Sequence, residues 1–448
     1  MGLFNIFRRK KKSTAPASTL KEIWRGFQQV LALNNAVLTL MEDLEAQLSA
    51  PGDLDLSQWC AQVDVLDRHF ANLVSALQSM SGNRWGELEP ARMRIREAIR
   101  QRLGRRAPLV TALLVRLEEA GPEVLPALGG KAANLARVKN QLGLPVPDGV
   151  VATLTAYRVF MAQEAPDGGG SLLARIKARL AAVDLAEPPA VEMASRDIQP
   201  MILAQPLPEA LQQDLLMESR RLAEASGARL AVRSSGGRED LGLTFAGQYE
   251  SFLGVAPEEV PSCWRQVVAS QFGERAMIYF KLQGLSLEDA AMGVLIQRLV
   301  DARAAGVMFI ADHEGDDPDR LVVNATWGLA ADLVSGRVSA DEFIISRENG
   351  RLLRAGMVPK EEYLAVREGR LTRLPVAQDK VAAPALEEGD LAQLAALARS
   401  LEGYDAGPQV VEWAQDQAGR LFIIQSRHLL SLKAGTVGPS QAVESPAG

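Results

Sequence analysis

The sequence predicts an α+β protein in which an all-helical segment precedes a mixed body of helices and strands. From 20 to 120 the apolar residues recur mainly at steps of three and four, which is the spacing of amphipathic helices. From 121 onwards short β-branched runs alternate with helical stretches, which is typical of a mixed, enzyme-like body. The 448 residues are enough for about three domains at roughly 150 residues each.

The helical segment is predicted to fold as a small bundle of three antiparallel helices. Breaks at 51–53 and 81–83 separate its three amphipathic runs. Trp24, Trp59 and Phe70 lie on the apolar faces of these runs, so we interpret them as core residues rather than as part of a ligand site. Because no residue pattern here points to catalysis, we expect the segment to serve docking or oligomerisation.

Five parts are expected along the chain. A basic, disordered tail and the helical bundle come first, two subdomains of the mixed body follow, and a second disordered tail, rich in glycine, serine and proline, comes last. The expected boundaries are 1–19, 20–120, 121–290, 291–433 and 434–448.

The composition argues against several classes of protein. A net charge of −6 disfavours nucleic-acid binding, which needs a positively charged face. Two cysteines and three histidines are too few for a disulfide framework or a histidine-rich metal centre. No apolar run is long enough to span a membrane. We therefore expect a cytoplasmic protein whose basic residues 1–12 make at most a weak peripheral membrane contact.

A first candidate anion-binding motif is GGKAANL, which begins at Gly129. Two glycines allow a tight turn before a helix. Lys131 then lies near the helix N-terminus, where exposed N–H groups and an ammonium group suit a phosphate. The motif lacks the spacing of a Walker A loop. Taken alone, it therefore fits a turn with a solvated lysine better than a ligand site.

A second candidate is the segment AVRSSGGRED at 231–240. A strand ends there at Arg233, the hydroxyl groups of Ser234 and Ser235, and two glycines. Such a loop can fold over a polyphosphate, to which it offers backbone N–H groups and a bidentate guanidinium. The alternative is a surface hairpin loop with incidental charge, and the segment alone does not decide between the two.

A third candidate is a β-hairpin near the end of the sequence. With a two-residue loop, Val410 would face Gln425 and Glu412 would face Ile423. Strand alternation then places Glu412, Gln425 and Arg427 on one face, where a carboxylate, an amide and a guanidinium can hold Mg²⁺ and phosphate. The alternative, a solvent-facing polar strand, is weakened by the apolar flanks. The opposite face would consist of Val411, Trp413, Phe422 and Ile424.

Seven sequence blocks together resemble the nucleotide-binding domain of phosphoenolpyruvate synthase and pyruvate phosphate dikinase. They cover about 124–432 and occur in family order. The resemblance implies an ATP-grasp-like fold with two subdomains that hold ATP between them. The blocks are GGKAANL, VPDGVVAT, AVRSSGGREDLGLTFAGQYESFLGV, VLIQRLV, AAGVMFIAD, ATWGLAADLVSGRVSADEF and VVEWAQDQAGRLFIIQSR.

The resemblance assigns ATP contacts in the first subdomain. Lys131 and Arg233 would bind the phosphates of ATP, with Ser234 beside them. The backbone near Gln297 would contact the adenine. These assignments favour the phosphate interpretation of the first two motifs over their alternatives.

The resemblance also assigns the metal site to the hairpin. Glu412 and Gln425 would bind both ATP and Mg²⁺, and Arg427 would contact the phosphates. The cations Lys131, Arg233 and Arg427 would be the catalytic residues, because phosphoryl transfer depends on positioning and charge neutralisation. ATP and Mg²⁺ are thus the expected cofactors.

The sequence lacks a counterpart of the family's phosphotransfer domains. In the full-length enzymes ATP phosphorylates a histidine that follows a Gly-Gly pair on a swivelling domain, and a barrel domain delivers the phosphoryl group to pyruvate. None of His69, His313 and His428 has that context. We therefore predict an ATP-binding subunit of a split phosphotransferase, similar to that of phenylphosphate synthase. Its partner protein would carry the phosphohistidine and acceptor-binding domains.

Two departures from the family pattern remove acids near the nucleotide. Val410 stands where the family usually has Asp, and Ala330-Ala331 replaces Gly-Glu after Trp-Gly-Leu. The affinity for Mg²⁺ is expected to fall, with Asp332 or Asp240 as candidate replacements. The alternative function is therefore a catalytically impaired nucleotide-binding regulator or scaffold.

Overall fold

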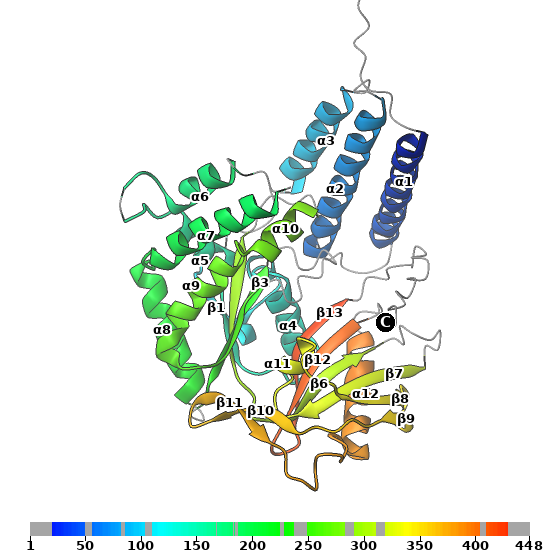
Figure 1. The fold of residues 1–448 in the computed structure, drawn as a ribbon, viewed down its shortest axis with the longest axis vertical. Helices are drawn as coiled ribbons and strands as arrows, with labels where there is room; N and C mark the ends of the chain where they lie inside the picture. Colours follow the sequence, from blue (N-terminus) through cyan, green and yellow to red (C-terminus); the bar gives the residue numbers. More distant parts are fainter. Residues whose placement is uncertain are drawn as a thin grey trace, which may run out of the picture. The chain divides into compact units, whose positions relative to one another are not determined.

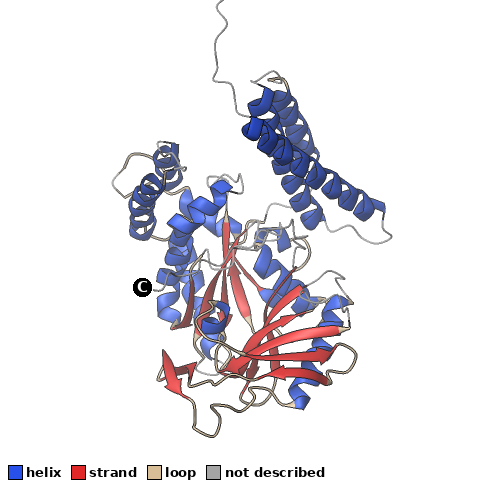
Figure 2. Cartoon of the chain, turned by 45° about the vertical axis from the view of Figure 1, so that its right-hand side comes forward, coloured by secondary structure: helices blue, strands red, loops and turns tan. Residues whose placement is uncertain are grey.

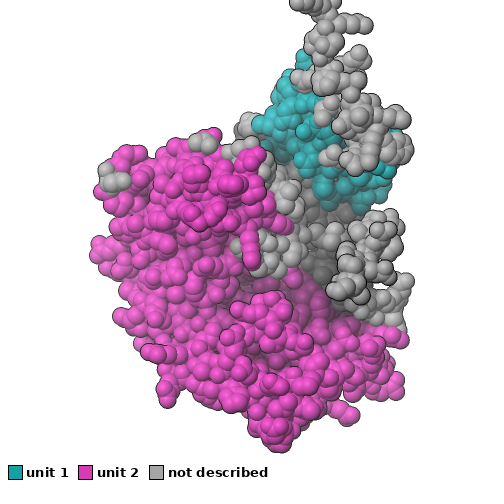
Figure 3. Space-filling model, viewed as in Figure 1, with its two compact units in different colours: residues 1–107 teal, residues 108–448 magenta. Residues whose placement is uncertain are grey.

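The computed structural model divides the chain into two compact units, residues 1–107 and residues 108–448 (Figure 3). The predicted tails 1–19 and 434–448 lie outside the residues that the structure describes. The described residues are 20–49, 56–81, 86–103, 110–166, 168–181, 183, 187–224, 228–236, 249–282, 291–310, 319–403 and 409–428.

The first unit contains three helices, as the spacing of its apolar residues predicts. Val37 and Leu44 of the first helix and Val74 of the second are buried, and they form the described core. Phe70 was predicted to lie in this core, but 36% of its surface is exposed. In a bundle of three helices only one narrow face of each helix is buried. In the second helix Val74 lies on that buried face. The side chains of Trp24 and Trp59 lie outside the described residues. The helices are α1 (Leu20–Ser49), α2 (Leu56–Ser81) and α3 (Leu88–Leu103).

The helical unit ends at 107, earlier than the predicted boundary at 120. The segment Leu114–Arg116 forms strand β1, which pairs antiparallel with strand β2 (Gly149–Ala152) in the second unit. Leu117 directly after it is fully buried in the core of that unit. A three-residue strand is too short to show an alternating pattern, so it was assigned to the preceding helical run. None of the described helices is both long enough and apolar enough to cross a membrane.

The first sheet of the second unit is five-stranded, with the order β1-β2-β5-β3-β4 and antiparallel neighbours throughout (Figure 1). Val232 and Ile296 on one of its faces pack against several helices. Val151 and Leu295 on the other face pack toward the second sheet. The further strands are β3 (Leu230–Gly236), β4 (Ser251–Val255) and β5 (Met292–Arg298). The helices are α4 (Gly130–Asn140), α5 (Leu154–Met161), α6 (Leu172–Ala181), α7 (Pro188–Ala204), α8 (Glu209–Glu224), α9 (Val260–Ser270) and α10 (Glu274–Leu282).

The second sheet is six-stranded and antiparallel, with the order β13-β12-β6-β7-β8-β9, and its strands are labelled in Figure 1. Figure 2 draws the strands in red. Along the sequence the second sheet begins with β6 at Ala302. The preceding strand, β5, still belongs to the first sheet. The predicted subdomain boundary at 290/291 therefore falls before a strand of the first sheet. Strands β10 and β11 pair with each other in a separate two-stranded sheet. The strands are β6 (Ala302–Phe309), β7 (Arg320–Trp327), β8 (Asp341–Ser346), β9 (Leu352–Gly356), β10 (Glu362–Arg367), β11 (Arg370–Pro375), β12 (Gln409–Asp416) and β13 (Leu421–His428).

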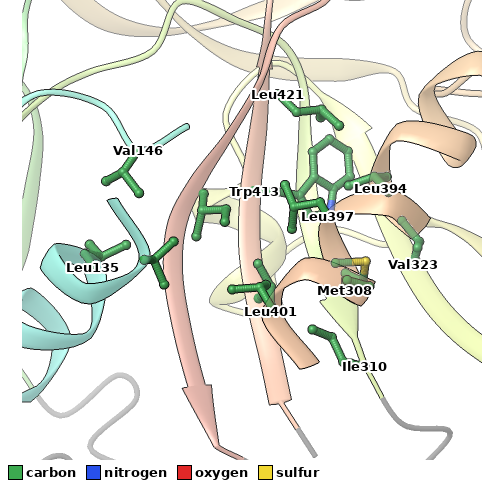
Figure 4. Packing of buried hydrophobic residues seen from close by; sticks show 14 of the residues in the cluster. Leu135, Val146, Met308, Ile310, Val323, Leu394, Leu397, Leu401, Trp413 and Leu421 are labelled. Carbon is green, nitrogen blue, oxygen red and sulfur yellow. The ribbon is translucent and has the colours of Figure 1, made fainter. Parts of the chain in front are cut away.

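The two faces of the second sheet differ. On one face Trp413 packs with Leu394 and Leu397 of helix α12 (Glu388–Glu402), and with Leu135 of α4 (Figure 4). Helix α4 is tied to this sheet by a hydrogen bond from Asn134 Nδ2 to the carbonyl oxygen of Ser426, at 2.6 Å. The other face, which we call the open face, carries only the small apolar cluster of Ala302, Ala305, Leu329, Leu364 and Ala414.

Candidate active site

The turn at Gly129 places Lys131 against the end of strand β3. Gly129 has a φ of +76°, and a Cβ atom there would lie 1.9 Å from the carbonyl oxygen of Ser235, so only glycine fits. Helix α4 begins at the next residue. Lys131 Nζ donates to Ser234 Oγ over 3.3 Å, and the backbone N–H of Ala132 donates to Ser235 Oγ over 3.0 Å. The first two predicted motifs therefore meet at one point.

Arg233 connects the two sheets. It lies in β3, and its Nη2 donates to Glu412 Oε2 on β12 over 2.7 Å. Its Nη1 donates to the carbonyl oxygen of Ile424 on β13 over 3.0 Å. The Arg233 and Glu412 side chains are 16% and 17% exposed, so this charge-assisted contact is largely shielded from water. A ligand that takes either group must first break the contact.

The register of the β12–β13 hairpin differs from the predicted one. Glu412 faces Gln425 and Trp413 faces Ile423, whereas the predicted pairs were Val410 with Gln425 and Glu412 with Ile423. The turn is longer than two residues, since the strands last pair at Gln415 and Leu421. A β-bulge between Glu412 and Trp413 leaves Ile424 without a register partner on β12.

The bulge also changes which apolar residues share a face. Trp413 belongs to the core beneath α12, as does Ile423. Ile424 packs instead against the cluster of the open face. The predicted apolar face of Val411, Trp413, Phe422 and Ile424 is thus only half right.

The polar side chains of the hairpin lie together on the open face. Glu412 and Gln425 are register partners, and Val410 faces Arg427 two pairs further along, which is the same face. Directly opposed residues on one face lie about 4.5–5.5 Å apart at Cβ. Glu412 and Gln425 can therefore offer two oxygen donors to one ion, which is the kind of ligand that Mg²⁺ prefers.

Val410 offers no oxygen to this site and is only 3% exposed. Among the described residues, no group of three or more histidine, cysteine or acidic side chains could hold a metal ion. The donors present fit a Mg²⁺ site with one carboxylate, in which nucleotide oxygens and water supply the other ligands.

Asp332 and Asp240 were the candidate replacements for the two acids that this chain lacks near the nucleotide. Asp332 is buried and accepts hydrogen bonds from Arg373 on both of its oxygens, so it is not available to a metal. Arg337 forms a second ion pair with it at 3.0 Å. Asp240 lies outside the described residues. Sequence reasoning missed both arginines, since nothing in their spacing pairs them with one acid.

Gln297, whose neighbouring backbone is expected to contact the adenine, lies in β5 between β2 and β3. Its side chain is 2% exposed and donates to the carbonyl oxygen of Pro147 over 3.2 Å. The chain directly after it does line a cavity of about 480 Å³. Such a volume suits a small-molecule ligand. Its apolar wall includes Leu299, Val300, Ala302, Leu329 and Phe422.

Residues 125–445 match the family model of the pyruvate phosphate dikinase AMP/ATP-binding domain. A probable phosphoenolpyruvate synthase of Methanocaldococcus jannaschii is 31% identical over 325 residues, and a rifampicin phosphotransferase of Streptomyces sp is 34% identical over 327 residues. Each match covers 71% of this chain, but only 27% and 36% of the respective relative. The chain therefore spans less than half the length of these relatives.

A likeness to the solved D-alanyl-alanine synthetase A of Vibrio cholerae has a TM-score of 0.24 at 8% identity, over 69% of this chain and 56% of that one, and carries no weight. The assignment rests instead on the family match, which spans the mixed body. The fold is the predicted α+β body preceded by helices. The chain belongs to the family of the pyruvate phosphate dikinase AMP/ATP-binding domain.

Proposed function

We propose that this chain binds Mg-ATP between its two sheets and transfers a phosphoryl group to a histidine on a partner protein. The observation that carries the proposal is a pair of contacts at the end of β3: Lys131 donates to Ser234, and Arg233, the residue before Ser234, donates to Glu412 on β12. Cations and one acid arranged in this way suit a magnesium–polyphosphate ligand.

Each residue has a separate task in this proposal. Lys131 and Arg233 hold phosphate oxygens from the side of the first sheet, and Arg427 holds them from the hairpin. Glu412 and Gln425 would hold Mg²⁺, which would neutralise phosphate charge when bound. The protein thus supplies position and charge compensation and needs no nucleophile of its own.

The contact between Arg233 and Glu412 describes the ligand-free protein. With Mg-ATP bound, Arg233 would hold phosphate oxygens in place of the carboxylate, and Glu412 would hold the metal in place of the guanidinium. Arg233 and Glu412 form an ion pair, so each needs an opposite charge in either state. This exchange keeps the site neutralised before and after binding.

The cavity after Gln297 is the proposed place of the adenine. The hinge residues Leu299 and Val300 connect the two sheets and line it, together with Leu329 and Phe422. A partly apolar cavity of this size can hold a nucleobase. The adenine contact is thus proposed at the backbone two to three residues after Gln297.

Isothermal titration of the full chain with ATP and Mg²⁺ tests the binding step. Lys131→Ala and Arg233→Ala should each weaken binding strongly, because each removes a charge-assisted phosphate contact. Arg354→Ala, which removes an exposed arginine on β9, serves as the matched control and should leave binding unchanged. A folded wild-type chain that does not bind millimolar ATP would contradict the proposal.

The transfer step requires a partner protein, whose histidine domain would then serve pyruvate or another small acceptor. In a dikinase-type reaction the pyrophosphoryl group of ATP would pass to the histidine with release of AMP, and loss of its terminal phosphate to water would leave the phosphohistidine. The step is tested by mixing the chain with a candidate partner and ATP and measuring AMP release. Glu412→Ala should abolish that release, and a partner whose histidine is replaced should show none. If AMP never forms with an intact partner and its acceptor, the kinase proposal fails.

A second candidate function is a nucleotide-binding regulator without turnover. Two observations favour it: Val410 supplies no second carboxylate, and Asp332 is already occupied by two arginines. In this case Glu412→Ala lowers ATP affinity but changes no reaction rate. The AMP measurement separates the two functions.

We propose that the helical unit serves docking or dimerisation. Its described residues include exposed apolar side chains, among them Leu31, Leu38 and Met41 of α1. Deleting 1–107 should therefore alter assembly size or partner capture and leave ATP affinity nearly unchanged. A deletion to 120 would also remove β1 and Leu117 from the core of the second unit, so it is the wrong truncation for this test.

A further inference from the structure

A second cavity, of about 350 Å³, lies beside the proposed nucleotide site. Strand β4 contributes Ser251 and Leu253 to its wall, and β10 and β11 contribute Leu364 and Leu371. Leu364 also belongs to the apolar cluster of the open face, and Ser251 is the register partner of Arg233. This second cavity therefore lies near the proposed nucleotide site, but none of its lining residues also lines the cavity of about 480 Å³.

Two arginines share one buried carboxylate on the wall of this cavity. Arg373 donates from Nε and Nη2 to the two oxygens of Asp332 over 3.0–3.1 Å. Arg337 Nε lies 3.0 Å from Asp332 Oδ1 and also donates to Ser335 Oγ over 3.0 Å. Since one carboxylate compensates only one guanidinium, the wall retains an excess positive charge. No other acid lines the cavity among the described residues.

The arginines keep donors available to a ligand. The Asp332 side chain is 8% exposed, whereas those of Arg337 and Arg373 are 64% and 52% exposed. Among the described residues, Nη1 and Nη2 of Arg337 have no hydrogen-bond partner. Nη1 of Arg373 has none either, whereas its Nη2 donates to Asp332. Asp332 thus holds one side of each guanidinium group and leaves the N–H donors on the other side available. Such donors can bind a phosphate bidentately.

We propose that this cavity binds a small organic phosphate, separately from the nucleotide. Arg337 and Arg373 would hold the phosphoryl group, and Ser251 can donate one further hydrogen bond. Leu253 and Leu371 would contact the apolar part of the ligand, which inorganic phosphate lacks. A volume of about 350 Å³ accommodates a small molecule of this kind. This inference does not depend on ATP binding.

The experiment is isothermal titration of the full chain with inorganic phosphate and with butyl phosphate. Butyl phosphate should bind several-fold more tightly, because its chain covers apolar wall. Arg337→Ala should weaken both ligands about tenfold or more, since it removes charged donors and leaves the Asp332–Arg373 pair intact. Leu371→Ala should reduce only the advantage of butyl phosphate.

Two control variants locate the binding. Arg354→Ala removes an equivalent exposed charge on β9 and should change nothing, and Lys131→Ala should leave the affinity for butyl phosphate unaltered. If Lys131→Ala abolishes that binding and Arg337→Ala does not, the anion binds in the nucleotide cleft and this inference is wrong, whereas the proposed function stands. Equal affinities of wild type and Arg337→Ala, or no binding at millimolar butyl phosphate, also overturn it.

Discussion

Two ion pairs in the second unit have similar chemistry but different surroundings. Lys360 and Asp341 meet at 2.6 Å with side chains only 2% and 0% exposed. Both Asp341 oxygens have further donors, the backbone N–H groups of Val358 and Ala385. Arg233 and Glu412 meet at 2.7 Å, but each retains about one sixth of its surface, and they join two sheets rather than neighbouring segments.

This difference separates a structural ion pair from an exchangeable one. A buried pair whose atoms are fully satisfied cannot release either partner without leaving a charge in the interior. A pair at the edge of a cleft can exchange its partners for a metal and a phosphate. We therefore expect the first pair to govern stability and the second to govern ligand binding.

The largest expected effect is that of Asp341→Asn, which leaves the Lys360 ammonium buried without a counter-charge. The free energy of unfolding should fall by about 3–5 kcal/mol, as for other broken buried pairs. Urea denaturation measures it. Asp197→Asn, in an ion pair with Arg179 whose carboxylate side is 48% exposed, is the control and should cost no more than about 1 kcal/mol. Similar losses in both variants would remove the contrast.

Glu412→Gln should affect ligand binding more than it affects stability. The loss of unfolding free energy should be smaller than that of Asp341→Asn, because each side chain of this pair keeps about one sixth of its surface. The Mg²⁺-dependent part of ATP affinity should fall at least roughly tenfold, since the amide carries no charge for the metal. Titrations with and without Mg²⁺ measure this part. A variant that unfolds readily yet binds Mg-ATP normally would reverse the assignment.

The contribution of the Asp390 carboxylate to the stability of the fold should depend on pH. Burial alone would raise its pKa, but hydrogen bonds from Glu387 N–H, Gln415 and Arg303 outweigh burial and hold the pKa below its ordinary value of 3.8. A carboxyl group with a lowered pKa stabilises the fold above its unfolded-state pKa and loses this effect as the pH falls through the folded-state value.

The stability difference between wild type and Asp390→Asn should therefore be full at pH 7 and shrink below about pH 4. Unfolding experiments at several pH values measure the trend. A difference that stays constant down to pH 3 would show that the charge of Asp390 does not contribute.

The smallest expected effect is that of Val410→Asp. The new carboxylate would lie on the same face as Glu412 and could give Mg²⁺ a second acid, so the Mg²⁺ concentration needed for half-maximal ATP binding should fall modestly, about two- to fivefold. Titration with Mg²⁺ at fixed ATP measures it. Val410→Asn, which adds an oxygen without charge, is the control. An equal gain in both variants would mean that charge is not the limiting factor.

The sequence predicted those parts of the site that depend on local geometry. The Gly129 turn and the end of β3 that carries Ser234 come together as the motifs indicate, because turn residues and strand ends are set by neighbours in the chain. The hairpin register could not be predicted, since it depends on the length of the turn and on a bulge at Ile424 that strand alternation does not reveal. The cluster of Asp332, Arg337 and Arg373 was missed for another reason: it joins separate elements through tertiary contacts.

The bulge has a consequence for insertions and deletions in this hairpin. Loss of one residue from a regular strand exchanges the two faces beyond that point. Loss of Ile424 would instead leave Ile423 in the core and Gln425 opposite Glu412, so the hairpin could shorten here without exchanging its faces. What such a deletion would remove is the carbonyl group that accepts from Arg233. Length variation at this point would thus loosen the connection between the sheets and preserve the polar row beside it.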